Sequence, residues 1–168
     1  MPAAAVLFCL VVAISDGDTL TARCDAQADL PAQTLKLRLA EIDAPEKGQP
    51  LGTRSRDHLA KLCFRQRAEV RPHSHDRYGR TVARIICAGL DASTEQVRAG
   101  LAWAFLRYLK YPAIRELEAQ ARVDRQGLWA DPAPVAPWKW RRGARPAGSS
   151  KGQSAVPASR DACPTQRG

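Results

Sequence analysis

The stretch at residues 38–46 (RLAEIDAPE) places the tightest constraint on how this chain can fold. The segment before it reads as a strand, because leucines alternate with polar side chains from residue 35 to residue 39. The strand must end near Pro45, because proline has no amide hydrogen for a ladder and favours an extended residue before it. One guanidinium and two carboxylates therefore follow a rigid element within nine residues. These are the side chains of Arg38, Asp43 and Glu46.

This combination indicates phosphate chemistry. Carboxylates can ligate a hard cation or accept a proton, and an arginine can bind a phosphate. A solvated strand end followed by a proline turn is the alternative. In an ideal strand Arg38 and Asp43, five residues apart, would face opposite ways. A shared site therefore requires a bulge or bend between them.

The charge of the chain is unevenly distributed. The net charge of the 168 residues is +9, which suggests a polyanionic partner. Residues 139–168 contain seven Lys or Arg and one Asp, which leaves +3 for residues 1–138. The same segment is rich in Gly, Pro, Ser and Ala and has no apolar period. We expect one domain over 1–138 and a disordered basic tail over 139–168, which either helps to hold nucleic acid or only improves solubility.

The amino-terminal segment is apolar from residue 3 to residue 14, which is too short to span a bilayer as a helix. It is similar to the apolar part of an export signal, but no Lys or Arg precedes it. It also runs directly into the polar residues 15–19. We therefore expect a buried first strand, with residues 1–8 either part of it or the remnant of an export signal, and any full signal upstream.

The five cysteines show neither C-x-x-C nor Cys/His zinc spacing. Cys9 and Cys24 lie at nearly equal distances on either side of the turn at 16–19, so a hairpin would place them opposite each other. Cys63 and Cys87 could form a second pair. Two disulfides would indicate an oxidising compartment. Buried free thiols are the alternative, and the sequence leaves both open.

The apolar patterns predict five strands and three helices. The strands lie near residues 11–14, 20–22, 35–39, 68–72 and 81–87, and the helices cover 54–64, a segment from 93, and 112–127. Thr53 is a candidate N-cap, and Gly17 is expected to supply a positive φ in a hairpin turn. A small, strand-rich and helix-interrupted chain suits an α+β fold built on a five-stranded barrel of oligonucleotide-binding type.

Three separated segments offer functional side chains at predicted strand ends: Asp18; Arg38, Asp43 and Glu46; and Tyr78 and Arg80. Two aspartates with a backbone carbonyl make an all-oxygen site, which suits Ca²⁺ or Mg²⁺ and not Zn²⁺. Two arginines on different strands can hold one phosphate from two sides. Tyr78 and Tyr108 could stack on a base, or could be ordinary half-buried tyrosines.

Together these motifs resemble the staphylococcal nuclease (thermonuclease) family over about residues 9–130. The motifs are Asp16-Gly17-Asp18-Thr19, Arg38-x4-Asp43-Ala44-Pro45-Glu46, Asp76-Arg77-Tyr78-Gly79-Arg80, Val97-Arg98-Ala99-Gly100-Leu101-Ala102 and Gly127-Leu128-Trp129. Any one of them alone would be weak, whereas several in order at matching spacing are specific.

The resemblance implies a barrel with three helices and Ca²⁺-dependent hydrolysis of DNA and RNA at the 5′-oxygen of the phosphodiester, which leaves 3′-phosphate ends. It also implies a role for each matched residue. By position, Asp18 and Asp43 match the carboxylates that bind calcium, and Ala44 matches a ligand that binds calcium through its carbonyl. Glu46 matches the general base or water-orienting residue, and Arg38 and Arg80 match the phosphate-binding arginines. Tyr78 and Tyr108 match residues that contact the nucleotide.

The chain also departs from the founding member of that family. Ala44 replaces a threonine, which is harmless if only the carbonyl binds metal. Leu106 replaces a nucleotide-pocket tyrosine, so the resemblance does not extend to base contacts or substrate preference. The cysteines are foreign to that member.

The sequence therefore favours a periplasmic or secreted nuclease that acts on DNA and RNA as a monomer, with no membrane association and no evident protein partner. The alternative is a catalytically silent nucleic-acid-binding barrel. Such a domain would be expected to lose its site carboxylates and arginines while it keeps its core. The chain retains all five of these side chains: Asp18, Arg38, Asp43, Glu46 and Arg80.

Overall fold

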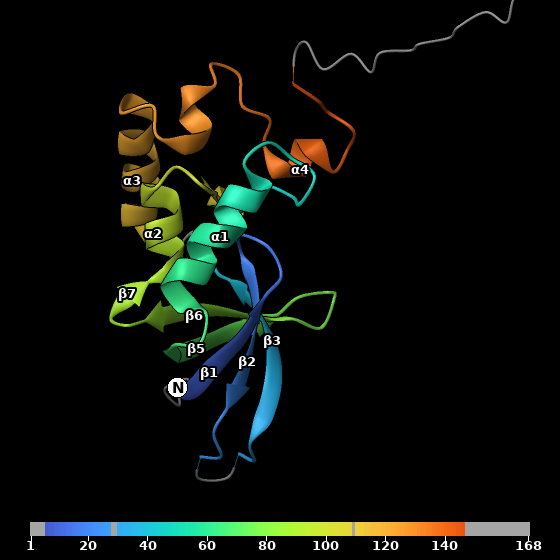
Figure 1. Ribbon diagram of the computed structural model, residues 1–168, viewed down its shortest axis with the longest axis vertical. Coiled ribbons are helices and arrows are strands. Elements are labelled where there is room, and N and C mark those ends of the chain that lie inside the picture. Colours follow the sequence, from blue (N-terminus) through green and yellow to red (C-terminus); the bar gives the residue numbers. More distant parts are fainter. Residues whose placement is uncertain (1–5, 28–29, 109, 147–168) are drawn as a thin grey trace, which may run out of the picture.

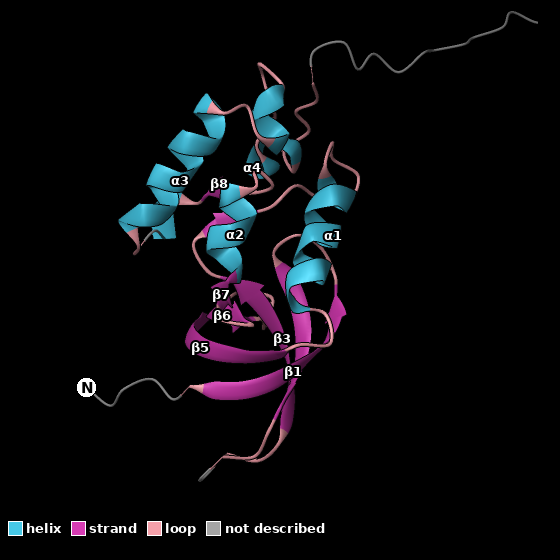
Figure 2. Cartoon of the chain, turned by 60° about the vertical axis from the view of Figure 1, so that its left-hand side comes forward, coloured by secondary structure: helices cyan, strands magenta, loops and turns pink. Residues whose placement is uncertain are grey.

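The computed structural model of the chain describes residues 6–27, 30–108 and 110–146, without the side chain of Tyr108. Five strands form a closed barrel, and the helices gather at one end of it (Figures 1 and 2). The barrel strands are β1 (Leu7–Ile14), β2 (Thr19–Cys24), β3 (Gln33–Leu39), β5 (Arg67–His75) and β6 (Thr81–Cys87). Their order is β3-β2-β1-β5-β6, and a parallel pairing between β3 and β6 closes the barrel. The predicted five-stranded barrel is confirmed.

The remaining elements are short strands and helices. The short strands are β4 (Ile42–Asp43), which pairs with β8 (Trp103–Ala104), and β7 (Leu90–Asp91), which pairs antiparallel with the end of β6. The helices are α1 (Gly52–Cys63), α2 (Ala92–Arg98), α3 (Pro112–Val123) and α4 (Pro137–Trp140), with 3-10 turns η1 (Leu106–Tyr108) and η2 (Gly127–Ala130). No helix within the described ranges has the length and apolar character needed to cross a membrane.

Alternation of side chains builds the barrel core. Every second residue of β6 is buried, from Thr81 to Cys87. Leu20 and Leu37, from neighbouring strands, have no exposed surface, and Leu59 of α1 closes the core from above. Full burial of such a side chain stabilises the fold by about 1.5–3 kcal/mol, so this apolar cluster fixes the strand register that positions the site.

Two expectations about helices are wrong. The predicted boundary between domain and tail at residue 138 falls inside α4, so the ordered chain extends beyond it. Thr53 is not the N-cap of α1; the helix begins at Gly52 after Leu51, whose backbone is left-handed. Residues 147–168 lie outside the described chain, and their disorder stays a prediction.

Both candidate disulfides are present. Cys9–Cys24 joins β1 to β2, and Cys63–Cys87 joins the end of α1 to the end of β6. Structural disulfides of this kind are typical of proteins that work outside the reducing cytosol. Cys163 lies outside the described residues.

Candidate active site

Strand register brings the three predicted segments together. Thr19 at the start of β2 pairs with Arg38 at the end of β3, and Arg38 pairs with Val82 near the start of β6. Asp18 and Arg80 immediately precede β2 and β6, so both lie beside the same end of β3. The site is therefore a consequence of how the barrel closes.

A buried polar cluster holds the turn that carries Asp18. The amide of Gln96, a residue with no exposed surface, donates to the Gly17 carbonyl at 2.5 Å and to the Ser55 carbonyl at 3.1 Å. The expectation of a positive φ at Gly17 is wrong, because the glycines with positive φ lie elsewhere in the described chain. Crowding requires the glycine instead, since a Cβ there would lie 1.9 Å from Ser55 Oγ and 2.8 Å from the Ala44 Cβ.

A tight bend allows Arg38 and Asp43 to share one site. Strand β3 ends at Leu39, and β4 begins at Ile42. Between them Glu41 adopts a left-handed backbone with φ 68°. A side chain that would have pointed away in a continuous strand is thereby turned toward Arg38, as the sequence required.

Asp18 and Asp43 converge on a single guanidinium nitrogen. Arg38 Nη2 lies 3.4 Å from Asp18 Oδ2 and 3.3 Å from Asp43 Oδ1. Asp18 Oδ2 also accepts from the Ala44 amide at 3.1 Å. Arg38 Nη1 donates to the Leu39 and Ile42 carbonyls, so the guanidinium is fixed in orientation. The sequence-predicted metal carboxylates and one arginine therefore meet as expected.

Arg80 reaches the same place from β6. Its Nε donates to Asp76 Oδ2 at 2.7 Å, and its Nη1 donates to Thr19 Oγ1 at 3.1 Å. The Thr19 hydroxyl in turn donates to Asp18 Oδ1. Tyr78 is 68% exposed, and the Arg80 guanidinium lies 5.5 Å from its ring centroid. Tyr108, the other predicted nucleotide contact, has its side chain outside the described residues.

A third arginine, for which the sequence motifs predict no role, also enters the site. Arg141, directly after α4, donates from Nη2 to Asp43 Oδ2 at 2.7 Å and from Nη1 to Glu46 Oε1 at 2.6 Å. Its segment had been assigned to the disordered tail. Pro137 followed by Trp138 and Trp140 was the available signal, because proline favours a first helical position and aromatic residues are rare in disordered segments.

Burial disfavours the charged form of two carboxylates of the site. Burial is the main reason that the pKa of Asp43 lies above its ordinary value, and the charge of Asp18 raises it further, against the opposing effect of Arg141 and Arg38. Burial and the nearby Asp18 raise the pKa of Asp16 to about 6. Additional positive charge close to Asp16 and Asp43 would favour their charged forms.

The donor set fits a hard divalent cation with few protein ligands. No group of three or more His, Cys, Asp or Glu side chains in the described ranges is arranged to hold a metal. Asp18 and Asp43 would supply one carboxylate each, and a main-chain carbonyl such as that of Ala44 and water would complete the shell. Oxygen-only coordination that retains water suits Ca²⁺ or Mg²⁺.

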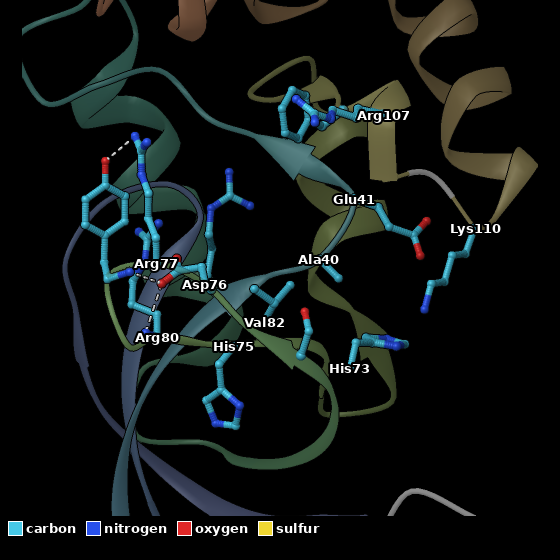
Figure 3. A pocket seen from close by; sticks show the side chains of 14 residues that line it. Ala40, Glu41, His73, His75, Asp76, Arg77, Arg80, Val82, Arg107 and Lys110 are labelled. Carbon is cyan, nitrogen blue, oxygen red and sulfur yellow. Dashed lines mark hydrogen bonds and ion pairs between the residues drawn. The ribbon is translucent and has the colours of Figure 1, made fainter. Parts of the chain in front are cut away.

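Two cavities meet at these residues. A cavity of 410 Å³ contains the carboxylates, Arg38 and Arg141, and a larger one of 780 Å³ adjoins it. Both are lined by Arg38, Arg77, Tyr78 and Arg80. Figure 3 shows the larger cavity, with Asp76, Arg77 and Arg80 at one end and Glu41, His73 and Lys110 at the other. Basic side chains thus continue from the site along a groove.

A closed barrel with carboxylates and guanidiniums around one cavity defines a protein that binds phosphate esters, in a fold that commonly binds oligonucleotides. Comparison with known proteins gives the family. The family model described as "Staphylococcal nuclease homologue" matches residues 36–131. The chain belongs to this family, and its nuclease relatives identify it as a nuclease.

Three relatives illustrate the relationship. A "Micrococcal nuclease" of Shigella flexneri is 42% identical over 148 residues, which covers 80% of each chain. An "Uncharacterized endonuclease" of Haemophilus influenzae is 40% identical over 134 residues, or 80% of this chain and 72% of that one. "Protein ParB" of Escherichia coli is 39% identical over 152 residues, or 84% and 82%.

Proposed function

We propose that the protein is a Ca²⁺-dependent endonuclease that hydrolyses DNA and RNA at the 5′-oxygen of the phosphodiester and leaves 3′-phosphate ends. The observation that carries the proposal is the convergence of Asp18 and Asp43 on one nitrogen of Arg38. Glu46 and Arg80 line the same cavity. Folding alone does not require two buried carboxylates to meet, since like charges repel and arginines must offset them here.

Asp18, Asp43 and the Ala44 carbonyl are the proposed ligands of Ca²⁺. When bound there, the ion supplies Lewis-acid stabilisation of the charge that develops on the phosphate. Each aspartate is already held in place, Asp18 by the Ala44 amide and Asp43 by arginines. The ligands are therefore oriented before a cation arrives.

Glu46 is the proposed base. Its side chain is 40% exposed, so the carboxylate can reach a water molecule at the mouth of the cavity. It orients that water and accepts its proton as the water oxygen attacks phosphorus. General-base catalysis of this kind contributes about 10²–10⁴-fold.

Arg38 and Arg80 are the proposed phosphate-binding residues. Each is held by protein acceptors, Arg38 by two carbonyls and Arg80 by Asp76. Fixed guanidiniums stabilise the transition-state charge without reorganising. The bond from phosphorus to the 5′-oxygen breaks as the new bond forms, so the phosphate stays on the 3′ side. The 5′-oxygen leaves as an alkoxide and takes a proton from water, which gives a 5′-hydroxyl.

The larger cavity is the proposed path of the nucleic-acid strand. Its basic side chains attract phosphates, and the exposed ring of Tyr78 offers a face on which any base can stack. Stacking on an aromatic face tolerates every base, which fits a nuclease acting on both DNA and RNA. The two disulfides support a periplasmic or secreted location. The proposed working form is a monomer.

The proposal is tested by incubating the pure protein with single- and double-stranded DNA and RNA, in Ca²⁺ or in EGTA. We expect cleavage in Ca²⁺ and none in EGTA. We also expect products that carry a 3′-phosphate, which a phosphatase removes. Binding without cleavage in Ca²⁺ would instead indicate a nucleic-acid-binding barrel. Products with 5′-phosphates would contradict the proposed bond cleavage.

A further inference from the structure

The segment after η2 is packed firmly against the rim of the site. Trp138 of α4 stacks on Phe105 with ring centroids 5.9 Å apart, and it meets Trp103 edge-on at 6.4 Å. Ala136 and Pro137 are buried. These contacts fix the helix that immediately precedes Arg141, so the position of this arginine is built into the fold.

A glutamine links the same segment directly to the Glu46 loop. Gln49, which is buried, donates from Nε2 to the Val135 carbonyl at 2.5 Å. Its Oε1 accepts from the Glu46 amide at 3.1 Å. The backbone of Glu46 and the chain leading to Arg141 therefore share one anchor, and their relative placement does not depend on the exposed side chains alone.

Arg141 divides its guanidinium between two carboxylates with different roles. It contacts both oxygens of Asp43, at 3.3 and 2.7 Å, and one oxygen of Glu46 at 2.6 Å. Asp43 Oδ1 also accepts from Arg38, whereas Oδ2 accepts from Arg141. A carboxylate oxygen has two acceptor positions, so Oδ2 retains one for a cation while Arg141 stays in place.

Glu46 has two possible partners in a loaded site. A flexible carboxylate beside a divalent cation tends to become an additional ligand, and more carboxylates give tighter Ca²⁺ binding. A carboxylate bound directly to the cation is a weak base and no longer holds a water molecule. Arg141 is positively charged, as the cation is, and it lies 2.6 Å from Glu46 Oε1. The arginine therefore competes with the cation for the Glu46 carboxylate.

We propose that Arg141 is a positioning residue that keeps Glu46 off the cation and available to the attacking water. The inference rests on the proposed function, because it assumes a cation at Asp18 and Asp43. It assigns the chain beyond α3 and η2 to the site, although the predicted domain boundary excluded residue 141. Tighter metal binding and slower chemistry should then result from the same substitution.

The test compares Arg141→Gln with Arg142→Gln, a matched control that removes the same charge from the neighbouring, exposed residue. Calorimetric titration with Ca²⁺ should give a Kd at least about threefold lower in R141Q, because Glu46 joins the shell and a positive charge is lost. The kcat should fall about 10-fold or more, within the range of general-base contributions, with KM little changed. Arg141→Lys, which keeps charge but not the fork, should recover part of kcat.

Weaker or unchanged Ca²⁺ binding in R141Q would overturn the inference, as would a kcat equal to that of R142Q. A merely structural role predicts loss of both affinity and turnover, with altered near-ultraviolet circular dichroism from the tryptophan cluster. If wild-type protein binds Ca²⁺ but cleaves nothing, the proposed function fails. The Ca²⁺ affinities of R141Q and of the double variant R141Q/E46Q then still test whether Arg141 restrains Glu46, because both lack the same positive charge.

Discussion

At the scale of single residues, the same sequence pattern can serve two different physical needs. The Asp-Gly dipeptide at 16–17 predicted a turn correctly, but for the wrong reason. Gly17 is required by the close approach of Ser55 and Ala44, which belong to segments distant in sequence. Contacts of that kind depend on the final packing, so composition and spacing could place the turn but could not explain its glycine.

Gly17→Ala should destabilise the protein and misplace Asp18. The added methyl would lie 1.9 Å from Ser55 Oγ and 2.8 Å from the Ala44 Cβ, so the turn must shift. Overpacking of this kind costs about 1–3 kcal/mol, which urea unfolding would measure. Gly48→Ala is the control, because a Cβ there meets nothing within 4 Å. Equal stability of the two variants would exclude crowding as the reason for Gly17.

Asp16→Asn should stabilise the cation-free protein at neutral pH. The folded-state pKa of Asp16 is about 6, above the ordinary 3.8, because burial and Asp18 disfavour its charge. Ionisation therefore costs folding free energy, and this cost appears as pH rises from about 4 to 6. In EGTA the melting temperature of D16N should exceed wild type by about 2–4 °C at pH 7.5 and match it at pH 4. Asp57→Asn, at an exposed aspartate, is the control. An equal rise in its melting temperature would mean that the change in net charge, and not the burial of Asp16, causes the stabilisation.

At the scale of elements, regular patterns were predictable and short docked segments were not. Alternation predicted the barrel strands, and Pro112 marked the start of α3. Helix α4 has only four residues among prolines and glycines, so no helical period was present. Its position depends on Trp138 meeting Phe105 and Trp103, which a sequence alone does not bring together.

Two truncations should separate this helix from the residues that follow it. A chain that ends at Pro146 keeps α4 and Arg141, so its kcat should match the full chain. Its binding should depend less steeply on salt, because charges without fixed geometry act through counterion release. A chain that ends at Ala136 should lose about 10-fold or more in kcat, the loss also expected for R141Q. A large loss of kcat in the longer truncation would mean that residues 147–168 help to form the site.

At the scale of the whole molecule, the barrel closes the site and the disulfides secure the barrel. The parallel pairing of β3 with β6 completes the ring and sets Arg80 beside Asp18. The family resemblance, which rests on the order of the motifs, predicted a closed barrel. The register of the strands depends instead on which leucines of β3 are buried in the core. Cys63–Cys87 ties α1 to the same strand β6.

Replacing Cys63 and Cys87 together by serine should lower the free energy of unfolding by about 2–4 kcal/mol, mainly by freeing the unfolded chain. Urea unfolding of oxidised protein would measure the loss. Cys163→Ser is the control and should leave stability unchanged. Peptide mapping that finds every thiol free in the oxidised native protein would contradict both disulfides and weaken the proposal of a periplasmic location.

The most direct test of the central claim is the turnover of Glu46→Gln and Arg80→Ala on single-stranded DNA with saturating Ca²⁺. Glu46→Gln keeps the size of the side chain but cannot accept a proton, so kcat should fall about 10²-fold or more. Arg80→Ala removes a fixed donor aimed at the phosphate, a loss of about 10²–10³-fold. The melting temperature of Glu46→Gln should stay close to wild type, because its pair with Arg141 is exposed. Arg80→Ala should melt somewhat lower, because its pair with Asp76 is largely buried, but it should remain folded at the assay temperature. Wild-type turnover in both variants would contradict the assignment of these residues to a nuclease site.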